Sequence, residues 1–118
     1  QPPPDAILAP LVHKTAQFYQ TIYRLGNKLP KRDHFGIHRL IEKRFLLMLE
    51  LTITAALQNK TDKPPTLIKL RIITEVVKHL IRNMAELNII TQKMYLSLEI
   101  DLQELSKMTN GWLKYLNI

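Results

Sequence analysis

Apolar residues recur at intervals of three and four along most of the chain, and prolines and glycines separate the periodic stretches. This period is typical of amphipathic helices, because residues three and four apart lie on one face of an α-helix. The pattern predicts helices over about residues 8–28, 31–59, 64–87 and 91–115. The last of them has the most regular pattern, formed by Tyr95, Leu98, Leu102, Leu105, Thr109, Trp112 and Leu116.

Prolines and glycines predict how the first two helices begin and end. Pro10 fits only the first turn of an α-helix, because proline has no backbone N–H to donate. Gly26 is expected to destabilise the C-terminal end of the first helix, and Pro30 is expected to prevent the helix from continuing. Gly36 lies near the start of the second helix, where we expect a hinge between a first turn and the main helix.

Polar residues predict the ends of the other two helices. Thr61 and Asp62 are the candidate N-caps of the third helix, and Thr91 is the candidate N-cap of the fourth. Asn88 is expected to end the third helix in the left-handed conformation. The pair Asn110–Gly111 is expected to interrupt the fourth helix near its end.

The lengths of the helices and joins predict how the helices pack. Each predicted helix is about 30–40 Å long, and the joins between helices are short. Short joins make successive helices antiparallel neighbours, so we expect an all-α, up-down-up-down four-helix bundle. Residues 1–118 would form it as a single domain. A pair of helical hairpins that swap between chains is the alternative architecture.

The chain is strongly basic, with 17 Lys and Arg against 10 Asp and Glu and a net charge of +7. This charge predicts attraction to nucleic acid, to an anionic membrane surface or to an acidic protein. A basic protein that is merely soluble is the alternative. No apolar run approaches the ~20 residues of a membrane span. The N-terminal stretch lacks the features of a signal peptide, and there is no cysteine, so we expect a cytoplasmic protein with no membrane partner.

Basic residues are concentrated on the two middle helices, at spacings of seven and four that place each set on one helix face. The candidate nucleic-acid-binding residues are Arg32, Arg39 and Lys43 on the second helix and Arg71, Lys78 and Arg82 on the third. We expect them to contact phosphates, with no readout of bases. An ordinary solvated helix face is the alternative, supported by Glu75 close to Arg71. The aromatic residues lie mostly at core spacing and are expected to pack inside: Tyr19, Tyr23, Phe35 and Trp112.

The sequence contains few residues in arrangements that support catalysis. His34 and His38 have the spacing of paired metal ligands, but no HExxH glutamate accompanies them. We expect both histidines to face solvent or phosphate, with no metal and no cofactor. Ser97 and Ser106 lie in no strand–turn–helix elbow, and the scattered glycines form no phosphate-binding loop. The sequence therefore predicts a protein that is not an enzyme.

Two stretches carry a family resemblance. The run LPKRDHFGIHRLIEK (residues 29–43) and the ending from Tyr95 through SLEIDLQELSKMTNGWLKYL resemble the accessory variability determinant (Avd) of diversity-generating retroelements. Avd proteins belong to a four-helix-bundle family that includes proteins encoded in intervening sequences of ribosomal RNA genes. The resemblance covers nearly the whole chain.

The resemblance implies a basic bundle without catalysis that assembles as a pentameric ring in a bacterial or phage-infected cell. Such a protein binds the retroelement reverse transcriptase and RNA or DNA, and it is required for mutagenic retrohoming. A closed ring needs contact between two different faces of each subunit. The residues expected to remain for that interface after each bundle fills its core are Tyr23, Phe45, Leu47 and Leu113. A bundle of the ribosomal intervening-sequence type that docks an acidic protein is the alternative function.

Overall fold

A computed structural model describes the backbone of residues 4–116 and the side chains of residues 10–116. The helices are α1 (Pro4–Leu25), α2 (Lys31–Asp33), α3 (Arg39–Leu57), α4 (Lys63–Glu86) and α5 (Gln92–Leu116). Two 3₁₀ turns, Gly26–Lys28 and Lys60–Asp62, lie in the joins, and a π-helical turn, His34–His38, connects α2 to α3. The described residues contain no strand, which confirms the all-α fold class. Residues 1–3 and 117–118 of the predicted domain lie outside the described residues.

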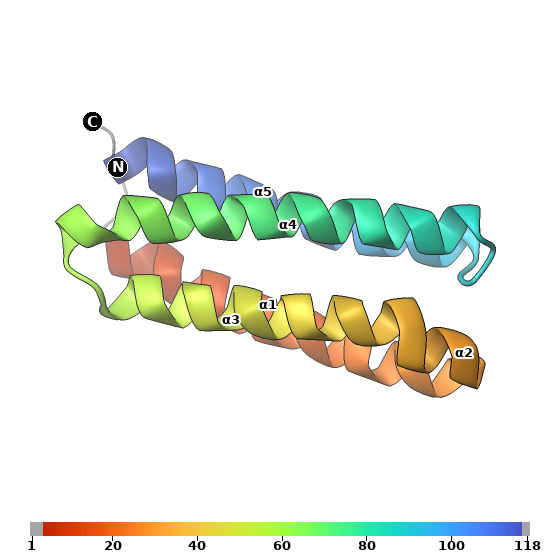
Figure 1. Cartoon of the computed structure of the whole chain (residues 1–118). Helices are drawn as coiled ribbons and strands as arrows, with labels where there is room; N and C mark the ends of the chain where they lie inside the picture. The colour runs from red at the N-terminus through yellow and green to blue at the C-terminus, as the bar shows by residue number, and fades with distance from the viewer. Residues whose placement is uncertain (1–3, 117–118) are drawn as a thin grey trace.

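The four long helices lie side by side in an elongated bundle of 45 × 21 × 19 Å (Figure 1). α1 packs on α3, α3 on α4 and α4 on α5, whereas the contact between α5 and α1 is smaller. The colours of Figure 1 show that α1 and α4 run toward the end of the bundle that carries α2. α3 and α5 run back from that end.

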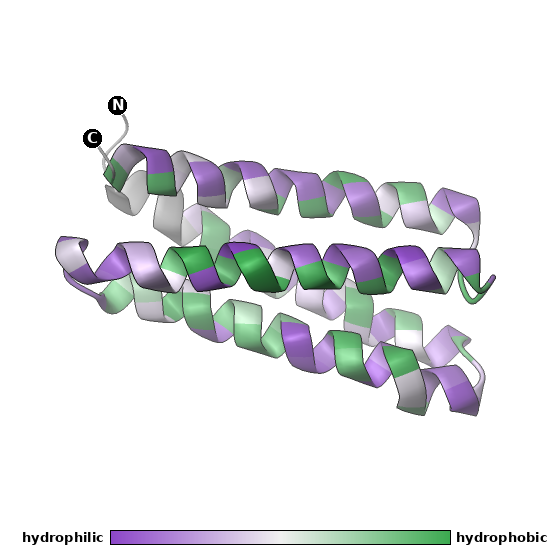
Figure 2. Cartoon of the chain, turned by 45° about the horizontal axis from the view of Figure 1, so that its top comes forward, coloured by the Kyte–Doolittle hydropathy of each residue, from purple (hydrophilic) through white to green (hydrophobic). Residues whose placement is uncertain are grey.

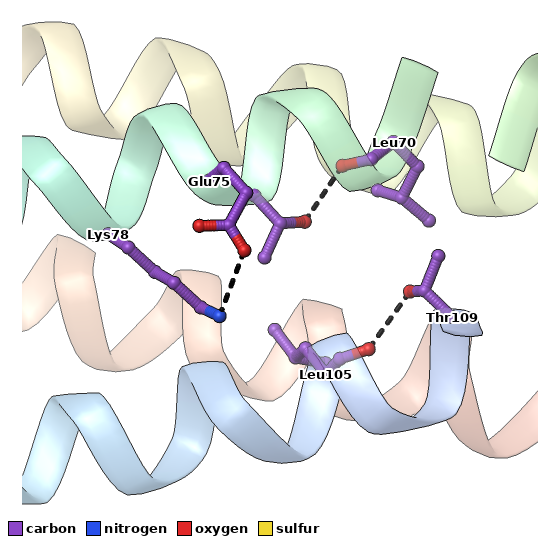
Figure 3. A network of polar contacts seen from close by, with 6 residues as sticks. Leu70, Glu75, Lys78, Leu105 and Thr109 are labelled. Atoms are coloured by element: carbon purple, nitrogen blue, oxygen red, sulfur yellow. Dashed lines mark hydrogen bonds and ion pairs between the residues drawn. The ribbon is translucent and has the colours of Figure 1, made fainter. Parts of the chain in front are cut away.

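The apolar stripe of each long helix faces a common core, in which Trp112 and Phe45 are the largest fully buried side chains. Three threonines within this core donate their hydroxyl hydrogens to the carbonyl four residues earlier in their own helix. These bonds are Thr15 to Leu11 (2.8 Å), Thr74 to Leu70 (2.8 Å) and Thr109 to Leu105 (2.9 Å). Figure 3 shows the bond between Thr109 and Leu105. The hydroxyls of these three buried threonines are therefore satisfied within their own helices.

The join between α1 and α3 has the hinge expected at Gly36, whose backbone angles (φ −97°, ψ −113°) are not helical. The carbonyl of Pro30 accepts hydrogen bonds from the amides of Asp33 (3.0 Å) and His34 (2.9 Å), so a short α2 forms before the hinge. The π-helical turn then carries the chain into α3. The second predicted helix is thus present, but it is divided by the hinge.

His38 is fully buried beneath this hinge, and the expectation that it faces solvent or phosphate is wrong. Its Nε2–H donates to the carbonyl of Ile22, 2.6 Å away, because a backbone carbonyl can only accept. Ile22 lies in the last turn of α1, where carbonyl groups lack partners within the helix. The His38 Nδ1 atom lies 3.1 Å from a Glu42 carboxylate oxygen. His34 stacks on the His38 ring, with the ring centroids 5.3 Å apart.

Two predicted features of the helix ends are confirmed, and both concern the join before α5. Asn88 has a positive φ of 59° and ends the turn after α4 in the left-handed region. The Thr91 hydroxyl accepts a hydrogen bond from the Met94 amide (3.1 Å), as expected of an N-cap.

Three other predictions about helix ends are wrong. α1 begins at Pro4, so Pro10 lies inside the helix and beyond its first turn. α5 continues through Asn110–Gly111 to Leu116 without interruption. Asp62 precedes α4 but makes no side-chain cap bond.

A lysine bonds across the join between α3 and α4. The buried amine of Lys63 donates to the Ala55 carbonyl in the last turn of α3. It also lies 5.9 Å from the centre of the Trp112 ring. One side chain therefore ties the end of α3 to the start of α4.

The first prediction concerns Gly26, which packs directly against the two histidines. A Cβ atom at this position would lie 2.5 Å from Cε1 of His38 and 2.6 Å from Nδ1 of His34. We expect Gly26→Ala to lower the free energy of unfolding by about 1–3 kcal/mol, because the rings must move. Urea unfolding followed by circular dichroism measures this loss.

Gly111→Ala is the matched control, because a Cβ at this exposed helical position meets nothing within 4 Å. It should raise the free energy of unfolding by about 0.5–1 kcal/mol, as alanine does in a helix interior. Equal unfolding midpoints for Gly26→Ala and the unchanged protein would contradict the close packing of the histidines on Gly26.

Candidate nucleic-acid interface

The six predicted nucleic-acid-binding residues lie in two separate places. Arg32, Arg39 and Lys43 lie around the hinge that leads into α3, and all three are exposed. Arg71, Lys78 and Arg82 lie along α4, where Lys78 is partly buried.

The α4 group shares its surface with acidic side chains. Lys78 Nζ lies 3.2 Å from Oε1 of Glu75 (Figure 3). A hydrogen bond with Tyr95, reinforced by the nearby carboxylates of Glu99 and Glu86, raises the pKa of Arg82. Two of the three cations on α4 therefore have acidic neighbours, and the positive charge of this face is reduced.

Because of the hinge, Arg32 and Arg39 do not lie on one face of a continuous helix. A spacing of seven places two residues on one face only in a continuous α-helix, and the π-helical turn interrupts the helix between Arg32 and Arg39. Arg39 and Lys43 both follow the hinge and lie one turn apart on α3. They line a shallow hollow of about 260 Å³ together with His34, Phe35, Glu42 and Leu46.

The aromatic side chains divide into buried and exposed ones. Trp112 is fully buried and Tyr19 is partly buried, as expected for packing. Phe35 and Tyr23 are 61% and 57% exposed, so the expectation that they pack inside is wrong. Phe35 directly precedes Gly36, and the changed helical register at the hinge leaves its ring at the surface.

A third basic region lies between α1 and α5, where the two helices have their smaller contact. It is a groove of about 340 Å³ lined by Lys14, Gln17, Phe18, Gln20, Thr21, Arg24 and Asp101. Lys14 is not among the binding residues predicted from the sequence. A signal was present, because Lys14, Thr21 and Lys28 repeat every seven residues and Arg24 lies on the same side of α1.

The four predicted interface residues have different degrees of burial. Tyr23 is exposed and Leu47 is partly buried. Phe45 and Leu113 are 0% and 4% exposed and belong to the core of the same chain, so the expectation that they remain for an interface is wrong. Phe45 packs on Phe18 of α1, with ring centroids 4.7 Å apart.

Other apolar side chains are exposed in their place. Figure 2 shows apolar positions interspersed with polar ones along α3 and α4. On α4 the exposed apolar residues recur every four residues and form a stripe on its outer face, whereas α3 exposes others at its start, near its middle and at its end. These residues are Ile68, Ile72 and Val76 on α4, and Leu40, Leu46, Ile53 and Leu57 on α3.

Within residues 10–116, no group of three or more His, Asp or Glu side chains is arranged to hold a metal ion. None of the described helices is both long enough and apolar enough to cross a membrane.

Comparison with known proteins identifies the family. No curated protein and no solved structure matches the chain. The model of the family described as bAvd-like matches residues 10–116, which extend from α1 to the end of α5. This match confirms the resemblance noted at residues 29–43 and at the end of the chain. The chain therefore belongs to the bAvd-like family.

Proposed function

We propose that this protein is a non-catalytic accessory factor of a diversity-generating retroelement and supports mutagenic retrohoming. In this role it binds the reverse transcriptase and RNA or DNA in the cytoplasm of a bacterial or phage-infected cell. The observation that carries the proposal is the family match over residues 10–116. The acting unit is a single antiparallel, up-down-up-down four-helix domain.

The charge of the chain supports binding to nucleic acid. Its net charge is +7, and Arg39 and Lys43 are exposed one turn apart on α3. Neither belongs to an ion pair within the part of the chain that the structure describes. Arg71 and Arg82 on α4 add exposed cations near Glu75 and Glu99. We therefore place the main phosphate contacts at Arg39 and Lys43, with Arg32 and the α4 residues in a weaker, supporting role.

Assembly would concentrate this charge. A pentamer carries a formal charge of about +35, five times that of one chain, and such a field attracts nucleic acid over long range. The exposed apolar side chains of α3 and α4, together with Tyr23 and Leu47, are the surfaces available for contact between subunits or with the polymerase.

The second prediction tests the phosphate contacts. Replacing Arg39 and Lys43 together by glutamine should weaken binding of labelled RNA of any sequence, because two phosphate contacts are lost. The slope of log affinity against log salt should become shallower by about 0.7 per contact for a single strand. Fluorescence anisotropy at several salt concentrations measures both quantities.

Lys107 and Lys114 provide a matched control, because both are exposed on α5 and their replacement by glutamine removes the same charge. This pair should leave the salt slope nearly unchanged. If both double variants reduce affinity and slope equally, binding depends on net charge alone and Arg39 and Lys43 form no site.

The third prediction concerns assembly. Light scattering should give a molar mass near 69 kDa, that of five chains of 13.8 kDa. The mass should be the same at low and high salt, because apolar contacts are not screened by ions. A monomer or dimer at both salt concentrations would contradict the pentamer.

A further inference from the structure

We propose that the hollow at the hinge binds an unpaired nucleobase of single-stranded RNA or DNA, with the base stacked on Phe35. Arg39 and Lys43 contact the adjacent phosphates. This inference rests on the proposed binding of nucleic acid, and it names the form of nucleic acid that the site recognises. It starts from the 61% exposure of Phe35, a large apolar ring at the surface next to two cations.

The Phe35 ring is held in position from below. It meets the His34 ring edge-on, with centroids 4.7 Å apart and an angle of 77° between the rings. His34 in turn stacks on His38, which is buried and hydrogen-bonded to the Ile22 carbonyl. A ring supported in this way loses little conformational freedom when a base stacks on it, which favours binding.

The charges around the hollow suit a phosphodiester. Arg39 and Lys43 are exposed cations that line it with Phe35. Glu42 is the one carboxylate in its lining, and its side chain is 20% exposed and lies 3.1 Å from the His38 ring. The lining therefore presents two cations on the surface, while its single carboxylate lies against the buried histidine.

A site that combines an exposed aromatic ring with cations should bind single-stranded nucleic acid in preference to a duplex. In a duplex the base faces are stacked on one another and are not available to a protein ring. In a single strand each base has a free face, and stacking on an aromatic side chain tolerates any sequence. Phosphate contacts occur with both forms, so Phe35 should affect only the binding of single strands.

The fourth prediction uses Phe35→Leu, with Phe35→Tyr as the matched control that keeps an aromatic ring. Phe35→Leu should weaken binding of an oligo(dT) single strand by roughly 5- to 150-fold, because the stacking of one base is lost. Binding of a duplex of equal charge should stay within about twofold, since its phosphate contacts persist. Phe35→Tyr should bind both forms like the unchanged protein. Fluorescence anisotropy measures these affinities, and circular dichroism checks that each variant is folded.

A second variant, Phe35→Trp, reports stacking directly. The chain has one tryptophan, Trp112, which is fully buried, so its emission should be insensitive to added oligo(dT). Quenching of the Phe35→Trp emission by oligo(dT), with no quenching in the unchanged protein, supports a base on the ring.

The outcomes separate this inference from the proposed function. If Phe35→Leu binds single strands and duplexes as the unchanged protein does, the stacking site is overturned and nucleic-acid binding stands. If the variant changes the molar mass measured by light scattering, Phe35 lies between subunits and the stacking site is also overturned. If the unchanged protein binds neither form, both proposals are wrong.

Discussion

The hydrogen bond from the buried His38 ring to the Ile22 carbonyl holds the start of α3 against the end of α1. The bond requires Gly26, because any side chain there would overlap the histidine rings. It also requires the hinge at Gly36, which turns His38 inward while Phe35 stays at the surface. A single buried contact thus sets the position of Phe35 on one side of the hinge and of Arg39 on the other.

The helices and their order could be predicted because each long segment has a clear apolar period and short joins with recognisable end signals. The hinge at Gly36 and the cap at Thr91 were also readable, since both depend on local conformation. The burial of Phe45 and Leu113 could not be predicted from the sequence. A helix with a wide apolar face does not show which of its apolar residues point into the core. The exposure of Phe35 depends on the π-helical turn at residues 34–38. Such a change of helical register cannot be recognised from apolar residues that recur at intervals of three and four.

The sequence could predict which cations belong to the candidate site, but it could not predict how they are arranged on the surface. The spacing placed Arg71, Lys78 and Arg82 on one helix face. It could not show that Tyr95 of another helix raises the pKa of Arg82. Such contacts between helices decide which positive charges are available to a phosphate. The family match places this basic bundle in the bAvd-like family. Our proposal adds that nucleic acid binds at the hinge.

Photo-crosslinking tests most directly whether nucleic acid binds at the hinge. Single-stranded RNA containing 4-thiouridine is irradiated with the protein, and crosslinked tryptic peptides are identified by mass spectrometry. Trypsin cleaves after Arg32 and Arg39, so residues 33–39 form a peptide that contains Phe35. We predict that this peptide carries the main crosslink and that excess unlabelled single strand removes it. Crosslinks confined to peptides of α1 and α5, with none at residues 33–39, would contradict nucleic-acid binding at the hinge.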